Sequence, residues 1–93
     1  MYIRSPDADR GFDWDGRNVA HIARHGVEPE EVEEMLLGRH IFLRSRGGRY
    51  VILGRSAPGR YLCAAFVCAG GMARVITARD MTRAERRRYG RGI

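Results

Sequence analysis

The chain has 93 residues, a hydrophobic fraction of 44% and a formal net charge of +6. These values fit one globular domain and exclude a chain that is disordered throughout. No apolar run approaches the roughly 20 residues needed to span a bilayer, and the first residues lack the apolar core of a signal peptide. We therefore expect a single cytoplasmic domain over residues 1–93.

The charge is distributed unevenly along the chain. Residues 1–38 hold four arginines against nine acidic residues, whereas residues 39–93 hold thirteen arginines against two. The chain contains no lysine, and guanidinium groups bind phosphate through two parallel hydrogen bonds and also stack on bases. This asymmetry predicts that the second part of the chain meets a polyanion, with RNA as the first candidate.

The first third of the chain predicts a short strand at residues 1–4 and then two helices. Asp15 is a good N-cap for the first helix, and Gly26 is a good stop after it. The second helix is expected to begin near Pro29, where a missing N–H costs nothing, and to end at Gly38. Apolar residues at helical spacing give the buried stripes of these helices: Val19, Ile22 and Ala23 in the first, and Val32, Met35 and Leu36 in the second.

Two histidines, His21 and His25, lie four residues apart on one face of the first helix. The glutamate of a zinc-protease helix is missing between them, and no third ligand is evident, so we expect no metal site and no cofactor. His25 can serve as a general acid or base. It can equally be a helix C-terminal histidine that the helix dipole favours.

Two other features of this region each have two interpretations. Glutamates cover the outer face of the second helix. This face is either simply solvated, or it balances the basic part of the chain or keeps RNA away from this surface. Trp14 alternates with Phe12, which favours packing in the core, although a tryptophan can also be a platform on which a base stacks.

From His40 onward the apolar spacing changes from 3.6 to 2, which is typical of strands. Four strands are expected, joined by Gly-rich hairpin turns: Ile41–Leu43, Tyr50–Leu53, Tyr61–Cys68 and Val75–Ala78. The third strand is nearly all apolar and should lie centrally, with both faces covered. Cys63 and Cys68 are an odd number of positions apart in it, so they face opposite sides and cannot form a disulfide within the strand.

The last helix begins with a capping box formed by Thr82 and Glu85. Glu85 can also pair with Arg88, and further arginines crowd the segment. The whole pattern predicts an α+β fold: two N-terminal helices packed on a mostly antiparallel sheet of four or five strands, followed by an Arg-rich C-terminal helix.

Motifs over about residues 12–89 carry a family resemblance. In chain order they are Phe12-Asp-Trp-Asp15, Asn18, His25-Gly-Val27, Pro29-Glu-Glu-Val32, Gly48-Arg-Tyr50, Leu53-Gly-Arg-Ser56, Gly59-Arg60, Val75-Ile-Thr-Ala-Arg79 and Thr82-Arg-Ala-Glu-Arg-Arg-Arg-Tyr89. Their order and spacing resemble the BrnT family, which are ribonuclease toxins of bacterial type II toxin–antitoxin systems. One departure is Glu28, which stands where relatives often have a Ser or Thr cap.

The resemblance implies a RelE-like fold and cleavage of RNA that inhibits translation and growth. It also implies neutralisation by a BrnA-like antitoxin, whose dimeric ribbon-helix-helix domain binds the promoter. Promoter DNA would then be contacted only through the antitoxin, and a two-plus-two complex is the expected assembly.

A ribonuclease that works without metal needs a base for the 2′-hydroxyl, cations on the phosphate and an acid for the leaving oxygen. Arg55 and Arg79 are expected to contact the scissile phosphate. His25, Glu85 and Tyr89 are the candidates for proton transfer. Further arginines are expected to bind RNA: Arg49, Arg60, Arg83, Arg86 and Arg87. Tyr50 and Tyr61 each follow an arginine, which suits base stacking but equally suits a half-buried strand.

Two other functions also fit the sequence. One is a non-catalytic nucleic-acid-binding or regulatory module, with the arginine helix lying along phosphates. The other is an inactive toxin relative that acts through protein interaction.

Overall fold

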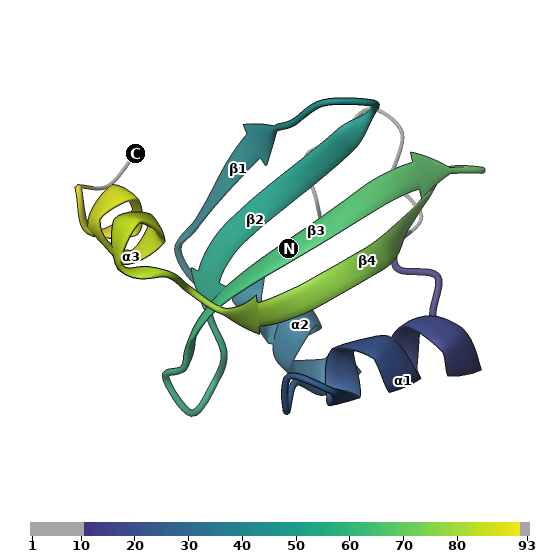
Figure 1. The fold of residues 1–93 in the computed structure, drawn as a ribbon, viewed down its shortest axis with the longest axis horizontal. Helices are drawn as coiled ribbons and strands as arrows, with labels where there is room; N and C mark the ends of the chain where they lie inside the picture. The colour runs from purple at the N-terminus through teal and green to yellow at the C-terminus, as the bar shows by residue number, and fades with distance from the viewer. Residues whose placement is uncertain (1–10, 92–93) are drawn as a thin grey trace.

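A computed structural model describes residues 11–91, so the strand expected at residues 1–4 lies outside the described part. The elements follow one another as two helices, a four-stranded sheet and a third helix (Figure 1). They are α1 (Gly16–Ala23), α2 (Pro29–Met35), β1 (His40–Arg44), β2 (Arg49–Arg55), β3 (Tyr61–Ala69), β4 (Met72–Asp80) and α3 (Arg83–Gly90). Over residues 11–91, no helix has the length and hydropathy that crossing a bilayer would take.

The sheet is an antiparallel meander in the order β1-β2-β3-β4, which confirms the predicted topology. The turn between β1 and β2 contains Gly47 and Gly48 at φ values of 65° and 74°, a conformation that glycine adopts without steric cost. Among the described residues the sheet has four strands. Phe12 adds one parallel bridge to Ala73, with the amide of Asp13 donating to the Ala73 carbonyl at 2.9 Å.

The first two helices cover one face of the sheet, and the main core lies between the two layers. Ile22 of α1 and Met35 of α2 pack there with Phe66 of β3, and all three are fully buried. The predicted stripe of α2 is confirmed, but Ala23 of α1 is exposed. Ile22 is buried as predicted and Val19 is half-buried. Asn18 is buried as well, because its side chain takes part in the helix cap.

The caps of α1 follow the sequence prediction. Asp15 accepts hydrogen bonds from the amides of Arg17 and Asn18 at 2.9 and 3.1 Å, and Gly26 follows the last turn with φ 69°. Trp14 packs on the core beside Phe12, with ring centroids 5.7 Å apart. Its indole Nε1 donates to Glu33 Oε2 at 2.8 Å. The core-packing interpretation of Trp14 therefore holds.

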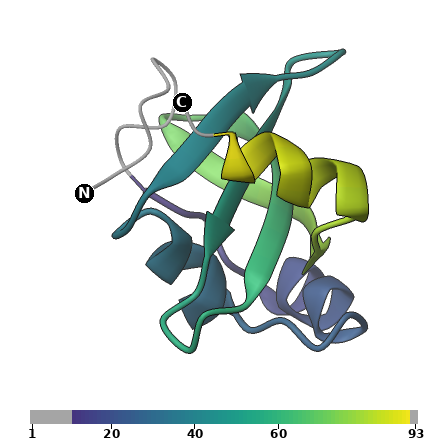
Figure 2. The same ribbon diagram turned by 90° about the vertical axis from the view of Figure 1, so that its left-hand side faces the viewer.

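The third helix lies against the opposite face of the sheet (Figure 2). Its capping box is confirmed, since the Glu85 amide donates to Thr82 Oγ1 at 3.1 Å and the Thr82 amide donates to Glu85 Oε1 at 2.8 Å. Tyr89 and Met81 form a second buried cluster with Cys63. Cys68 packs against the main core instead, so the two cysteines face opposite sides as predicted.

Coverage of this second face is incomplete. Helix α3 lies over one end of it, and beyond that end Ala65 and Val67 of β3 are only half-buried. The prediction that both faces of the third strand are covered is therefore correct for only part of its length. A single helix of eight residues is too short to span a strand of nine, since a helix rises about 1.5 Å per residue and a strand about 3.3 Å.

Candidate active site

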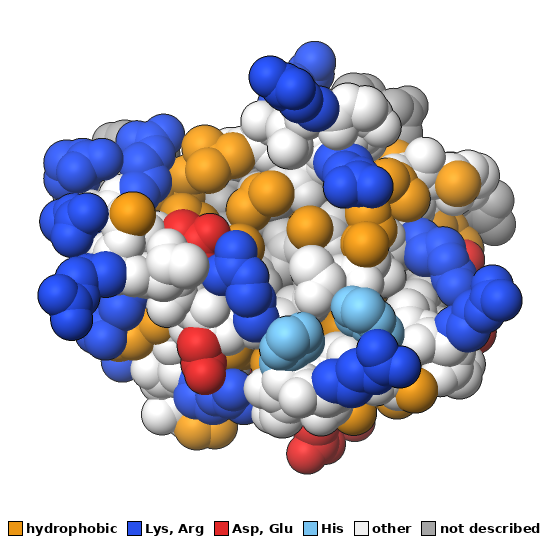
Figure 3. Space-filling view, viewed as in Figure 1, with side chains coloured by type: hydrophobic (Ala, Val, Ile, Leu, Met, Phe, Trp, Pro, Cys, Tyr) orange, Lys and Arg blue, Asp and Glu red, His pale blue; other side chains and the backbone are white. Residues whose placement is uncertain are grey.

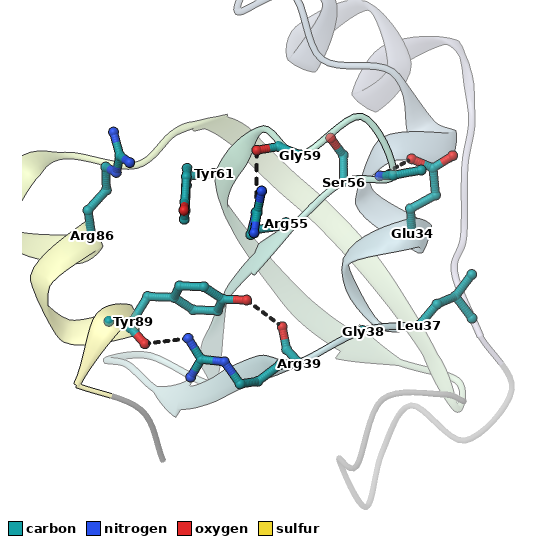
Figure 4. A pocket seen from close by; sticks show the side chains of 12 residues that line it. Glu34, Leu37, Gly38, Arg39, Arg55, Ser56, Gly59, Tyr61, Arg86 and Tyr89 are labelled. Carbon is teal, nitrogen blue, oxygen red and sulfur yellow. Dashed lines mark hydrogen bonds between the residues drawn. The ribbon is translucent and has the colours of Figure 1, made fainter.

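A pocket of about 760 Å³ opens where α3, the β2–β3 turn and the segment after α2 meet (Figure 4). Its charged lining consists of three arginines and one acid, namely Arg39, Arg55, Arg86 and Glu34. Two tyrosines, Tyr61 and Tyr89, form its aromatic wall. A pocket with this excess of positive charge suits an anionic ligand.

The central feature of the pocket is a stack of Arg55, Tyr61 and Arg86. The Cζ atoms of Arg86 and Arg55 lie 4.0 and 4.7 Å from the centroid of the Tyr61 ring. Figure 4 shows the two guanidinium groups on either side of the ring. A cation–π contact orients a guanidinium without neutralising its charge, so both cations keep their positive charge for a ligand.

The turn between β2 and β3 fixes Arg55 from one side. Its Nε donates to the Gly59 carbonyl at 3.4 Å. Gly59 has φ 98°, and a Cβ built there would lie 3.0 Å from Arg55 Nη2, so both backbone conformation and space require glycine. The Ala57 amide donates to Glu34 Oε1 at 2.9 Å, which joins this turn to α2. The single acid in the pocket lining therefore has a structural hydrogen bond.

Arg39 and Tyr89 hold α3 on the sheet by two reciprocal hydrogen bonds. Arg39 Nη2 donates to the Tyr89 carbonyl at 2.7 Å, and the Tyr89 hydroxyl donates to the Arg39 carbonyl at 2.9 Å. The guanidinium also lies over the Tyr89 ring, 4.0 Å from its centroid. Tyr89 meets the edge of Tyr61, with centroids 6.0 Å apart. The anchor of α3 and the arginine stack thus form one contact network.

Arg79 and Glu85 form a bidentate ion pair beside this network, with N–O distances of 2.7 and 3.0 Å. The pair replaces the expected contact between Glu85 and Arg88. The hydrogen bond from Arg79 is the main reason that the pKa of Glu85 falls to about 2, and the same pairing raises the pKa of Arg79. Burial raises the pKa of the neighbouring Cys63 thiol to about 11. A carboxylate with such a low pKa is a weak proton acceptor.

Arg60 joins three elements rather than projecting into solvent. Its guanidinium donates to Glu31 at 3.0 Å, to the Gly26 carbonyl at 2.7 Å and to Asp80 at 3.1 Å. Its pKa is raised, first by the hydrogen bond with Asp80. These contacts tie α2 and the α1–α2 turn to the end of β4. Both terminal nitrogens of Arg60, Nη1 and Nη2, are therefore engaged within the protein.

The remaining predicted residues are dispersed. His25 is exposed in the turn after α1, and its ring contacts His21 with centroids 6.2 Å apart. Arg49 is exposed at the start of β2, and Arg83 and Arg87 are exposed on α3. The structure thus gathers Arg55, Arg86 and Tyr89 in the pocket and leaves the others outside its lining.

Sequence reasoning did not include Arg39, Glu34 or Tyr61 among the site residues. Arg39 lies 50 residues from its partner Tyr89, and no local pattern indicates a contact over that separation. The one available signal is at Tyr61, which directly follows Arg60, an arrangement that suits a stacking residue.

A second, smaller hollow of about 360 Å³ lies near the start of α1, where Arg17, His21 and Arg74 line it. Arg74 is paired there with Asp15 at 2.7 Å and with Asp13 at 3.6 Å. These acids offset its charge, so this hollow is a weaker anion site than the pocket beneath α3. Residues 11–91 contain no cluster of three or more His, Cys, Asp or Glu side chains suited to a metal ion.

Comparison with known protein families identifies a match to this chain. A family model described as "ribonuclease toxin, BrnT, of type II toxin–antitoxin system" matches residues 14–85. That span contains α1, α2, the whole sheet and the start of α3, and so it includes Arg55, Tyr61 and the Arg79–Glu85 pair. Among curated proteins none matches this chain. Because the matched residues make up most of its length, the chain belongs to the BrnT family of ribonuclease toxins of type II toxin–antitoxin systems.

Proposed function

We propose that this chain is a metal-independent endoribonuclease toxin with a RelE-like fold, and that it cleaves RNA in the pocket beneath α3. The arginine stack around Tyr61 carries the proposal. Its two guanidinium groups are held in fixed positions by one ring, and none of the ion pairs within residues 11–91 includes Arg55 or Arg86. Such preorganised cations stabilise charge that develops in a transition state.

The reaction proceeds by attack of a 2′-hydroxyl on the adjacent phosphorus. A bond forms between O2′ and phosphorus while the bond to the 5′-oxygen breaks, which yields a 2′,3′-cyclic phosphate and a free 5′-hydroxyl. Negative charge gathers on the non-bridging oxygens, where Arg55 and Arg86 would each donate hydrogen bonds. The 2′-hydroxyl proton goes to a base, and the leaving oxygen receives a proton from an acid.

Proton transfer has two candidates inside the pocket, Tyr89 and Glu34. The Tyr89 hydroxyl is the proposed acid, and the Glu34 carboxylate is the proposed base. We assign Glu85 and Arg79 a positioning role, because their mutual ion pair lowers the pKa of Glu85 and holds α3 on β4. His25 lies outside the pocket lining, so its predicted role in catalysis lacks geometric support.

Arginines outside the pocket would guide the RNA backbone toward it. Arg83 and Arg87 are exposed on α3, and Arg49 is exposed on β2. Figure 3 shows arginines gathered over α3, at the left of the view. Exposed cations of this kind raise affinity for any RNA sequence and make binding depend on salt.

The family also implies a protein partner, since type II toxins are paired with an antitoxin. We propose a BrnA-like antitoxin with a ribbon-helix-helix domain, joined to the toxin in a two-plus-two complex in the cytoplasm. The toxin would then reach promoter DNA only through the antitoxin. Free toxin would inhibit translation and growth by cleaving RNA.

The test combines growth with cleavage by purified protein. Induction of the chain alone should arrest growth, and co-expression of the protein encoded by the adjacent gene should relieve the arrest. The purified chain should cleave RNA in the presence of EDTA. Replacing Arg86 with Gln should reduce the cleavage rate roughly 100-fold, whereas the control Arg88→Gln, on the same helix but outside the pocket lining, should cleave within about twofold of the wild-type rate. Equal rates for the two variants would contradict the site.

A non-catalytic RNA-binding module is the second candidate. It is favoured by one observation, that the Tyr89 hydroxyl and the Glu34 carboxylate each already have a hydrogen-bond partner in the protein. RNA binding that depends on Arg55 and Arg86, without any cleavage in EDTA or in magnesium, would identify this function instead.

A further inference from the structure

The face of the sheet that carries α3 is only partly covered. Helix α3 and its flanking residues bury Ile41, Leu53 and Cys63 at one end. Because side chains alternate along a strand, Leu43 and Val51 lie on the same face, and both are half-buried at the edge of this cluster. Figure 3 shows hydrophobic side chains gathered over the middle of this face.

The open part of the face consists of aliphatic side chains from three neighbouring strands: Leu43, Val51, Ala65 and Val67. We call these four residues the aliphatic patch. Each is intermediate in exposure, and none of them lines the pocket beneath α3. A cluster of partly exposed apolar side chains on one face of a small protein is a candidate interaction surface.

The chemistry of the aliphatic patch favours a protein over RNA. Single-stranded RNA binds to sheets through aromatic side chains on which bases stack. Among the aromatic residues of these strands, Tyr61 lies in the pocket beneath α3. Phe42, Tyr50 and Phe66 instead face α1 and α2 and stack on one another within the core. The patch itself has only aliphatic groups, which are suited to the apolar side of a helix or strand.

Arginines border the aliphatic patch on several sides. Arg49 lies on the same face of β2 as Val51, and Arg74 pairs with Val67 across β3 and β4. Arg79 lies further along β4, beside α3. Arg74 and Arg79 are each paired with acids of this chain, so of these three arginines Arg49 is the one whose charge is offered to an occupant. Arg49 takes part in no ion pair within residues 11–91. A second copy of this chain would bring arginines against arginines, so the charge favours an acidic occupant.

We propose that the aliphatic patch is the docking surface for an acidic, amphipathic segment of the antitoxin. Its apolar side would cover Val51 and Val67, and its carboxylates would meet Arg49. This inference rests on the proposed antitoxin partner, but it does not depend on RNA cleavage. It places partner and substrate on neighbouring sites at the two sides of α3.

The first test needs no variant. Methyl groups of the wild-type chain are followed by NMR while the protein encoded by the adjacent gene is added. The methyl signals of Leu43, Val51 and Val67 should shift on binding. Those of Val27 and Val32, which are buried beneath the helices, should stay in place. The reverse pattern, or no binding at all, would overturn the docking surface.

The second test introduces a charge into the aliphatic patch. Val67→Glu should weaken binding of the adjacent gene's product at least tenfold, while the free variant keeps its melting temperature and its RNA cleavage. Ala23→Glu adds the same side chain at an exposed position of α1 and should bind as the wild type does. Normal partner binding by Val67→Glu would overturn the proposal.

The same experiments would identify two other possible occupants of the aliphatic patch. If the wild-type chain is a dimer and Val67→Glu is a monomer that still binds the partner, the patch is an interface between copies of this chain. If Val67→Glu loses affinity for RNA alone, the patch belongs to the substrate path. If the wild-type chain cleaves no RNA but binds its partner through Val67, the docking surface stands and the ribonuclease proposal fails.

Discussion

At Tyr61, one phenol ring lies between two guanidinium groups that would otherwise repel each other. The negative faces of the ring offset that repulsion without removing either charge, whereas a carboxylate placed between the arginines would reduce the charge offered to phosphate. In the proposed mechanism, Tyr61 would therefore act on the reaction through Arg55 and Arg86, and a change at Tyr61 would alter the placement of the two cations rather than their number.

This role predicts that Tyr61→Phe and Tyr61→Leu behave differently. Phe keeps the ring and should hold kcat within about twofold. Leu removes two cation–π contacts of about 0.5–1 kcal/mol each, so kcat should fall roughly tenfold while KM changes little. Steady-state cleavage of an RNA oligonucleotide gives both constants, and thermal melts control for folding. Equal kcat values for the two variants would show that the ring does not position the arginines.

The Arg79–Glu85 pair predicts a dependence of stability on pH. The pKa of Glu85 lies near 2 in the folded chain, below its ordinary value of 4.5. The folded state therefore gains stability above pH 4.5 and loses it as the pH falls toward 2. Solvent weakens the pair, since the side chains of Glu85 and Arg79 are 25% and 39% exposed, so its contribution is about 1–2 kcal/mol.

Glu85→Gln should accordingly reduce the free energy of unfolding by about 1–2 kcal/mol at pH 7 and flatten its decline between pH 4.5 and 2. Urea unfolding at several pH values measures both effects. Glu30→Gln is the matched control, because Glu30 is exposed in the first turn of α2. If the free energy of unfolding of Glu85→Gln fell between pH 4.5 and 2 as steeply as that of the wild type, the Arg79–Glu85 pair would not be the source of the pH dependence.

At the scale of elements, α2 lies close against β2 at Gly54, and the glycine permits this approach. A Cβ at Gly54 would lie 3.1 Å from the Cβ of Met35 and 3.2 Å from its carbonyl oxygen. Backbone oxygen cannot move aside without shifting α2, so Gly54→Ala should cost about 1–3 kcal/mol of stability. Gly16→Ala is the control, since nothing lies within 4 Å of a Cβ there. Urea titrations in which both variants unfold like the wild type would contradict this packing.

The boundaries of the elements could largely be predicted from the sequence. The change in apolar period at His40 located the sheet, and Asp15 and Thr82 located two helix starts. These signals are local, because a cap or a turn requires particular side chains within a few residues. Coverage of β3 could not be predicted, since an apolar strand looks the same whether a helix or a partner protein covers it.

Less of the candidate site than of the fold could be predicted, because several contacts in the site join residues that lie far apart in the sequence. The charge asymmetry predicted that arginines form the site, and the structure brings the predicted residues Arg55, Arg86 and Tyr89 together in one pocket. The contact between Arg39 and Tyr89 depends on how α3 docks on the sheet, which no local pattern specifies. The choice of Arg79 over Arg88 as the partner of Glu85 depends on the same docking.

For the molecule as a whole, net charge overstates the charge that RNA can meet. Residues 39–93 carry thirteen arginines against two acids. Three of these arginines are held by acids of the same chain: Arg60 by Glu31 and Asp80, Arg74 by Asp13 and Asp15, and Arg79 by Glu85. They join layers of the fold, so the positive surface available to RNA is concentrated at α3 and its pocket.

The attachment of α3 has a consequence for how activity is lost. The helix rests on Tyr89, its hydrogen bonds with Arg39, and the pair between Glu85 and Arg79, whereas the sheet and the first two helices share the larger core. Weakly attached segments open locally at a lower free energy than the whole fold. Detachment of α3 would remove Arg86 from the pocket while the sheet stays folded, so under the proposed mechanism we expect activity to be lost reversibly, well below the temperature at which the whole fold denatures.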